Sequence, residues 1–211
     1  MGQNNVTPST GKLGILCVGL GAVSSTFITG TLMIRKGMGK PVGSITQMAK
    51  IRVGRGYKAQ YKHVSEIVSM PTLDDIVFGA WDILPDNAFE SAMHAEVLRD
   101  RDIYPVKEEL EKIVPMKGVY DPNYVKALDG TWVKDPSLTR WELMEQVRQD
   151  IRDFKEKNGC SRIVVIWAAS TEIYVPRYDE VHGSIEAFEA AMKADDREHI
   201  APSMCYAYAA L

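Results

Sequence analysis

The amino-acid sequence predicts an α/β protein with a Rossmann-like parallel sheet and helices on both faces of that sheet. Three apolar runs, at residues 13–18, 75–83 and 162–170, have the composition of strands that are buried on both faces. Helical patterns lie between these runs. The alternation of strand and helix is typical of a parallel sheet covered by helices.

The first predicted strand, Leu13–Val18, leads into a turn at Gly19 and Gly21. A helix that extends to about Lys36 should follow this turn. Lys36 would lie in the last turn, where a positive charge interacts favourably with the helix dipole, and Gly37 can end the helix.

The uncharged stretch at residues 13–34 also has the length of a membrane span. Nine of its 22 residues are Gly, Ser or Thr, so the stretch is only modestly hydrophobic. A secretory signal begins with basic residues, and residues 1–10 contain no Lys or Arg. We therefore favour a buried strand and helix over a membrane segment or a signal peptide.

The middle of the chain is less regular. Residues 38–74 are rich in glycine and weakly periodic, so we expect an insertion of short elements and loops after the first strand and helix. The second strand, at residues 75–83, follows this insertion, and Asp86 or Asn87 can cap the next helix. Residues 105–137 contain four prolines and are expected to be irregular.

The strongest helical periodicity lies in residues 139–157. Its large apolar residues recur at intervals of three or four positions: Trp141, Met144, Val147, Ile151 and Phe154. Gly159 would end this helix before the third strand. The last twelve residues again begin like a helix, with Pro202 in the first turn, and stay apolar to Leu211.

From this apolar ending we expect the chain to be a fragment of a longer protein. Residues 1–11 are polar, with Pro and Gly, and predict a flexible N-terminal arm. Residues 12–211 would then form one dinucleotide-binding domain.

Composition excludes several classes of function. The net charge of -3 gives no electrostatic reason to expect nucleic acid or a membrane surface as a partner. The three cysteines, Cys17, Cys160 and Cys205, form no C-x-x-C pair, which favours a reducing, cytoplasmic compartment. The four histidines are isolated, so we predict no metal site.

The segment G-L-G-A-V-S-S, Gly19–Ser25, resembles a G-x-G-x-x-G dinucleotide turn with Ser24 in place of the third glycine. In such a turn the first glycine allows a tight bend, and the second lets the backbone approach the pyrophosphate. The candidate cofactor-binding residues here are Gly19, Leu20, Gly21, Ala22, Val23, Ser24 and Ser25. The alternative is a buried corner between strand and helix that binds nothing.

Two further candidates lie at strand ends, where ligands of open α/β sheets bind. Asp82 ends the second strand and can bind the adenosine ribose if residues 38–74 are an insertion; otherwise it is a helix cap or a loop residue. After the third strand, small and hydroxyl-bearing residues would let a flat ligand approach: Ala168, Ala169, Ser170 and Thr171. The alternative is that they only pack and cap a turn.

Five separate stretches resemble the myo-inositol-1-phosphate synthase family, also called inositol-3-phosphate synthase. They are GSITQMAKIRVG (43–54), GAWDI (79–83), VRQDIRDFKEKNG (147–159), VVIWAASTE (164–172) and IAPSMCYAYAAL (200–211). They occur in the same order as in the family and with similar spacing. The resemblance covers the chain from Lys12 to Leu211.

The resemblance implies a homotetrameric, NAD-dependent isomerase of inositol and phospholipid biosynthesis. The family converts glucose 6-phosphate to 1D-myo-inositol 3-phosphate, and NAD accepts and returns one hydride, without net redox change. By position, Gly19–Ser25 matches the pyrophosphate loop, Asp82 the ribose-binding acid, and Ala168–Thr171 the strand end that contacts NAD.

Two departures from the family are visible. The eukaryotic-type loop reads G-x-G-G-N-N-G, and its asparagines and later glycine are absent here. The chain is also about half of a family member, and the catalytic lysines belong to the other half, so we assign no catalytic residue and expect the isolated chain to be inactive. The alternatives are another NAD-dependent Rossmann oxidoreductase and a non-catalytic dinucleotide-binding or assembly module.

Overall fold

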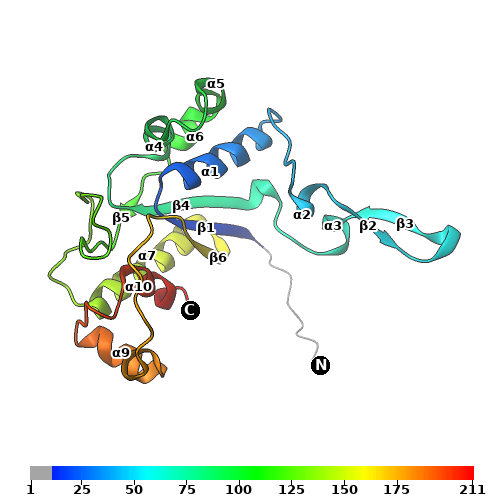
Figure 1. Cartoon of the computed structure of the whole chain (residues 1–211). Helices are drawn as coiled ribbons and strands as arrows, with labels where there is room; N and C mark the ends of the chain where they lie inside the picture. Colours follow the sequence, from blue (N-terminus) through cyan, green and yellow to red (C-terminus); the bar gives the residue numbers. More distant parts are fainter. Residues whose placement is uncertain (1–10) are drawn as a thin grey trace.

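A computed structural model describes residues 11–211, so the predicted N-terminal arm lies outside the described residues except for Gly11. The main sheet has four parallel strands in the order β5-β4-β1-β6 (Figure 1). Their bounds are Lys12–Val18 for β1, Ile76–Asp82 for β4, Met116–Lys117 for β5 and Cys160–Trp167 for β6. The predicted parallel sheet is confirmed.

Helices cover both faces of this sheet (Figure 1). On one face lie α1 (Ala22–Arg35) and α4 (Ala88–Ala95), and on the other lie α7 (Arg140–Asn158) and α10 (Pro202–Ala209). The other helices are α2 (Ile45–Met48), α3 (Val64–Ile67), α5 (Asp100–Ile103), α6 (Lys107–Glu111), α8 (Asp179–His182) and α9 (Ile185–Lys193). Single 3-10 turns lie at Gly56–Lys58, Leu73–Asp75 and Tyr104–Val106.

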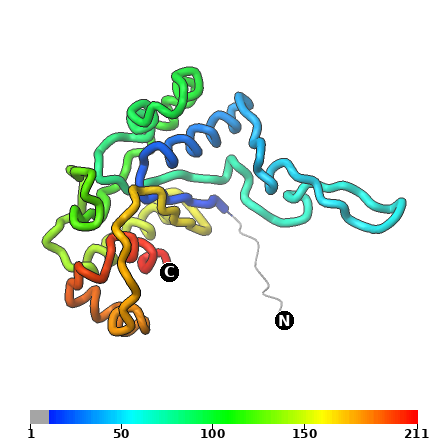
Figure 2. The backbone as a smooth tube through the Cα atoms, viewed as in Figure 1, coloured from blue at the N-terminus to red at the C-terminus, as the bar shows by residue number. Residues whose placement is uncertain are grey.

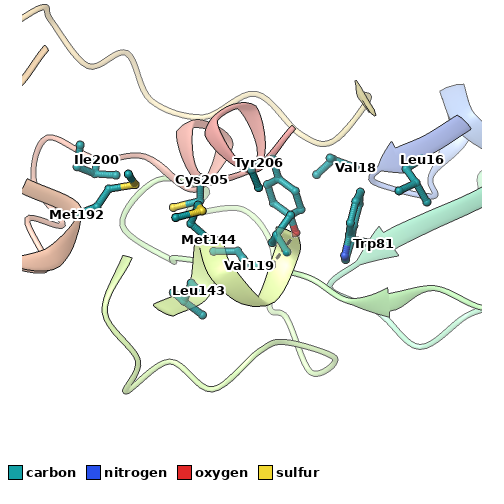
Figure 3. Close-up of a cluster of buried hydrophobic side chains, with 12 residues drawn as sticks. Leu16, Val18, Trp81, Val119, Leu143, Met144, Met192, Ile200, Cys205 and Tyr206 are labelled. Atoms are coloured by element: carbon teal, nitrogen blue, oxygen red, sulfur yellow. Dashed lines mark hydrogen bonds between the residues drawn. The ribbon is translucent and has the colours of Figure 1, made fainter. Parts of the chain in front are cut away.

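The central strand β1 contributes to two separate cores, because successive side chains of a strand point to opposite faces. Leu16 and Val18 pack with α7 and α10 on one face, together with Trp81 of β4 (Figure 3). Cys17 packs into the second core with residues of α1 and α4. Burial on both faces explains why the strand is almost entirely apolar.

Two predicted helix-end signals are confirmed, at Asn87 and Gly159, and α7 also begins with a capping box that was not predicted. Thr139 and Glu142 form a capping box at the start of α7: the Thr139 hydroxyl accepts the Glu142 N–H at 3.2 Å, and the Glu142 carboxylate accepts the Thr139 N–H at 2.8 Å. Gly159 follows the helix in the left-handed region, at φ 63°. Asn87 caps α4, as one of the two predicted candidates.

The third strand ends earlier than predicted. β6 stops at Trp167 rather than at residue 170, and its last pairing contact is the Ala168 N–H donating to the Val18 carbonyl at 2.9 Å. The neighbouring strand β1 also ends at Val18, where the chain turns at Gly19 and leaves the extended conformation of the strand.

The glycine-rich insertion contains an antiparallel hairpin of β2 (Lys50–Val53) and β3 (Gln60–His63), with α2 and α3 at its base. We call residues 45–68 the hairpin extension, because they project away from the sheet (Figure 2). The segment at residues 105–137, predicted to be irregular, contains α6 and the edge strand β5. Within residues 11–211, no helix combines the length and the apolar character that crossing a bilayer requires.

Candidate functional site

A cavity of about 490 Å³ opens where β1, β4 and β6 end. The three strands finish side by side because Val18 is in register with Trp81 of β4 and with Trp167 of β6. Eight of the twelve predicted cofactor-binding residues line this cavity: Gly19, Gly21, Ala22, Val23, Asp82, Ala168, Ala169 and Ser170. The fold thus gathers three segments that are far apart in the sequence.

The turn after β1 requires a glycine at its first position. Gly19 has φ 91°, and its N–H donates to the Trp81 carbonyl at 2.8 Å. A Cβ at this position would lie 2.7 Å from the Cα of Ala169. The left-handed backbone and the close approach of the segment after β6 both exclude a side chain here.

Gly21 differs from Gly19, because its backbone does not require a glycine and the space beside it is empty in the described structure. It has φ -70°, which any residue adopts, and no heavy atom of the described residues lies within 4 Å of an added Cβ. Because Gly21 lines the cavity, a side chain there would enter space that a ligand can use.

The N-terminus of α1 faces the same space. The helix begins at Ala22 after Gly21 as its N-cap residue; its first turn holds no acid, and no side chain within residues 11–211 caps it. The first N–H groups of a helix lack partners inside the helix and carry partial positive charge. Ala22 and Val23 of this turn line the cavity, which is therefore suited to an anion such as a phosphate.

Three residues of the predicted loop hold the turn together and do not border the cavity of the described structure. The Ser24 hydroxyl donates to the Gly19 carbonyl at 2.6 Å, and the Ser25 hydroxyl donates to the Ala22 carbonyl at 3.4 Å. Leu20 is completely buried. The hydroxyls of these two predicted cofactor-binding serines are thus already engaged in hydrogen bonds within the turn. Thr171 is exposed and also lies outside the cavity lining.

Asp82 connects the end of β4 to the turn after β1. Its Oδ2 accepts the N–H of Leu20 at 2.5 Å, and its Oδ1 accepts the N–H of Leu84 at 2.9 Å. Each carboxylate oxygen has two lone pairs, so Asp82 retains acceptor capacity toward the cavity that it lines.

Sequence reasoning missed one wall of the cavity, the loop at residues 118–121 and Tyr206 of α10. The Val119 N–H donates to the Tyr206 hydroxyl oxygen at 2.7 Å (Figure 3). The Tyr206 ring packs edge-on against Trp81, with ring centroids 5.2 Å apart. Burial raises the pKa of Tyr206 well above its ordinary range, so this hydroxyl stays neutral. The two-residue strand that carries the loop has too little pattern to detect in the sequence.

The cavity lining also contains two carboxylates that interact with side chains outside the lining. Glu172 accepts the N–H and the hydroxyl of Ser203, at 3.0 and 2.5 Å. Burial raises the pKa of Glu172, and the bonds from Ser203 only partly offset this increase. Asp121 forms a buried ion pair with Arg140, with 2.6 Å between Oδ2 and Nη2. Glu172 directly follows the predicted strand-end motif, but its partner lies 31 positions away.

No group of His, Cys, Asp and Glu within residues 11–211 is arranged to hold a metal ion. The three cysteines are buried free thiols. Burial raises the pKa of Cys17 to about 11 and that of Cys205 to about 12, so neither is a thiolate nucleophile near neutral pH.

Comparison with known proteins gives a consistent result. Residues 13–211 match a family model for an NAD-binding domain that is described as myo-inositol-1-phosphate synthase. The chain is 54% identical over 210 residues to inositol-3-phosphate synthase 1 of Bacteroides thetaiotaomicron, covering 99% of this chain and 48% of that protein. It is 35% identical over 213 residues to inositol-3-phosphate synthase of Citrus paradisi, covering 94% of this chain and 41% of the relative.

The fold is also similar to that of a solved structure. The crystal structure of inositol-3-phosphate synthase from Caenorhabditis elegans matches 97% of this chain with a TM-score of 0.85 and 24% sequence identity. The match covers 42% of that chain. The chain therefore spans less than half the length of each of these relatives.

Proposed function

The chain belongs to the myo-inositol-1-phosphate synthase family, and we propose that it binds NAD in the cavity at the ends of β1, β4 and β6. Residues 13–211 match the NAD-binding model of the family, which makes NAD its cofactor. The assignment of individual residues to parts of NAD follows the family resemblance, and the geometry of the cavity supports it.

One observation carries the assignment: the empty space beside Gly21 adjoins the uncapped N-terminus of α1. Backbone N–H groups of Ala22 and Val23 would hold the pyrophosphate there, and a Cβ on residue 21 would take the room that it needs. Asp82 would accept a hydrogen bond from the adenosine ribose through a free lone pair. The residues present fit a dinucleotide.

The other predicted residues would act in two groups. Ala168, Ala169 and Ser170 form the side of the cavity next to Gly19, where small side chains let a flat ligand approach. Leu20, Ser24 and Ser25 would serve the site indirectly, by holding the turn through buried contacts. Thr171 would need a rearrangement to contact a ligand, because its side chain is exposed outside the lining.

We further propose that the complete enzyme converts glucose 6-phosphate to 1D-myo-inositol 3-phosphate, in the cytoplasm and as a homotetramer, for inositol and phospholipid biosynthesis. Bound NAD supplies a reversible hydride acceptor for this isomerisation. The residues of this chain contribute the binding and orientation of NAD, and none of them is assigned to proton transfer. The 211-residue chain alone should therefore form no product.

The test of cofactor binding uses fluorescence of the tryptophans in the cavity lining, Trp81 and Trp167. Titration of the 211-residue chain with NAD should quench this fluorescence with a saturable dependence, and calorimetry should give the same Kd. A chain that is folded by circular dichroism and shows no saturable response up to millimolar NAD would overturn the proposal.

The test of activity compares the 211-residue chain with the longer native polypeptide of its source. Phosphorus NMR should detect inositol phosphate from glucose 6-phosphate and NAD only with the longer polypeptide. Product from the 211-residue chain would refute the predicted inactivity. NAD reduction without an inositol product, by the longer polypeptide, would instead favour a different oxidoreductase.

A further inference from the structure

The hairpin extension makes its main contacts within itself rather than with the body of the domain. β2 pairs with β3, and α2 and α3 pack against each other and against β3. Every residue of β2 and all but His63 of β3 are exposed. The short helices α2 and α3 support the base of the hairpin, and its exposed strands would gain further stability from an external partner.

The surface of the hairpin extension is unusually apolar for an exposed segment. Tyr57 is 95% exposed, Ile45 73% and Tyr61 70%. Further exposed apolar side chains in the same segment are Met48, Ile51, Val53, Ile67 and Val68. Ile51 and Val53 share one face of the hairpin with Lys62, and Tyr61 shares the other face with Arg52, so both faces present apolar and basic side chains to a partner.

The charge of the hairpin extension is opposite to that of the rest of the chain. Its basic residues are Lys50, Arg52, Arg55, Lys58 and Lys62, against the single acid Glu66, so its formal charge is +4. The whole chain has a net charge of -3, which leaves -7 on the remainder. None of the five basic residues forms an ion pair within the described part of the chain. A partner of this segment should be acidic.

The segment of residues 179–198, which includes α8 and α9, carries the opposite charge, and we call it the acidic surface. Residues 179–198 contain seven acidic and two basic residues. Asp179, Glu189, Asp195 and Asp196 are in ion pairs, which leaves Glu180, Glu186 and Glu198 exposed without an ion-pair partner among residues 11–211. Ile185 is exposed beside them on α9, as are Ile173 and Tyr174 just before this segment.

These two surfaces lie at opposite ends of the molecule, so the hairpin extension cannot reach α9 of its own chain (Figure 1). We propose that the hairpin extension docks on the acidic surface of α8 and α9 of a second copy of this chain. Basic side chains meet Glu180, Glu186 and Glu198, and the exposed tyrosines and isoleucines pack against each other. The contact is independent of the cavity and of NAD.

The test is sedimentation equilibrium of the 211-residue chain at low ionic strength, with three charge-reversal variants. One carries Lys58→Glu and Lys62→Glu on the hairpin extension, and one carries Glu180→Lys and Glu186→Lys on the acidic surface. The control carries Arg152→Glu and Lys157→Glu on α7, which changes the net charge by the same amount as the first variant. Melting curves confirm that each variant is folded.

Wild type and control should self-associate, with a dissociation constant that rises with salt because screening weakens the charged contacts. Each of the other two variants alone should associate at least about tenfold more weakly, and an equimolar mixture of the two should recover association. A monomeric wild type would overturn the proposal. So would full association of either variant alone, or a mixture of folded variants that stays monomeric.

Discussion

The carboxylate of Asp82 and the backbone N–H of Leu20 are joined by a hydrogen bond of 2.5 Å that spans 62 positions of the sequence. The residue proposed to bind ribose therefore also holds the glycine turn against the end of β4. If Asp82 binds the ribose as proposed, one side chain serves both ligand recognition and loop position, and its substitution should disturb both.

Asp82→Ala should weaken NAD binding by about 1–3 kcal/mol, because it removes a partly buried acceptor and leaves the N–H groups of Leu20 and Leu84 without their partner. This loss corresponds to about 5- to 150-fold in Kd. Calorimetry with the wild type and the variant measures it.

An NAD analogue that lacks the adenosine 2′-hydroxyl separates the two roles of Asp82. If Asp82 binds the ribose, the analogue and Asp82→Asn both remove the same hydrogen bond. The losses of binding free energy that they cause separately should then not add when they are combined. Full additivity would mean that Asp82 serves only to hold the turn.

The two glycines of the turn should respond differently to alanine. Gly19→Ala should destabilise the fold by at least about 1–2 kcal/mol, because of its positive φ and the approach of Ala169. Gly21→Ala should change stability by no more than about 1 kcal/mol but weaken NAD binding, since its methyl group enters the cavity. Urea unfolding and calorimetry measure the two effects.

Gly37→Ala is the matched control for these variants. Gly37 also has a positive φ of 70°, and nothing in the described structure lies within 4 Å of its added Cβ. It should lose stability through backbone strain alone and bind NAD as the wild type does. Normal NAD affinity of Gly21→Ala would place the pyrophosphate elsewhere.

Tyr206→Phe should lower the free energy of unfolding by about 1–3 kcal/mol, because the buried Val119 N–H loses its acceptor. The same change at Tyr208, two positions along α10, removes a hydroxyl that contacts Glu189 outside the cavity. Hydrogen exchange at the Val119 amide should speed up only in Tyr206→Phe. Equal exchange rates of the Val119 amide in both variants would show that the Tyr206 hydroxyl does not hold the loop.

Glu172 should make stability depend on pH in the acid range. Its pKa is raised in the folded state by burial, so the folded protein holds this proton more tightly than the unfolded chain. The contribution of Glu172 to stability is therefore largest below its ordinary pKa of 4.5 and falls as pH rises through the raised folded value. Glu172→Gln removes this pH-dependent contribution to the free energy of unfolding, because glutamine does not titrate.

The measurement is urea unfolding of both proteins from pH 4 upward. Stability of the wild type relative to Glu172→Gln should fall with increasing pH across that window. The difference between the two proteins cancels the titration of other carboxylates, such as Asp75 and Asp135, whose pKa values are lowered by hydrogen bonds. A relative stability that rises with pH would contradict the raised pKa.

Local patterns were sufficient to predict the main elements. The apolar run of β1, the periodicity of α7 and the helix-end residues Asn87 and Gly159 all act over a few residues, so their effect is visible in the sequence. Other features were not predicted, among them β5 and the early end of β6. β5 is too short to have a pattern, and the early end of β6 depends on where its neighbour stops.

By itself the sequence determined the α/β class, the order of strand and helix, and a glycine turn before a helix, because burial periodicity and turn chemistry are local properties of the chain. Only the tertiary structure decided which residues share the cavity. Leu20 meets Asp82 and Val119 meets Tyr206 across 62 and 87 positions, through strand register and helix packing. Such contacts depend on how distant segments pack together, and no local pattern encodes that packing.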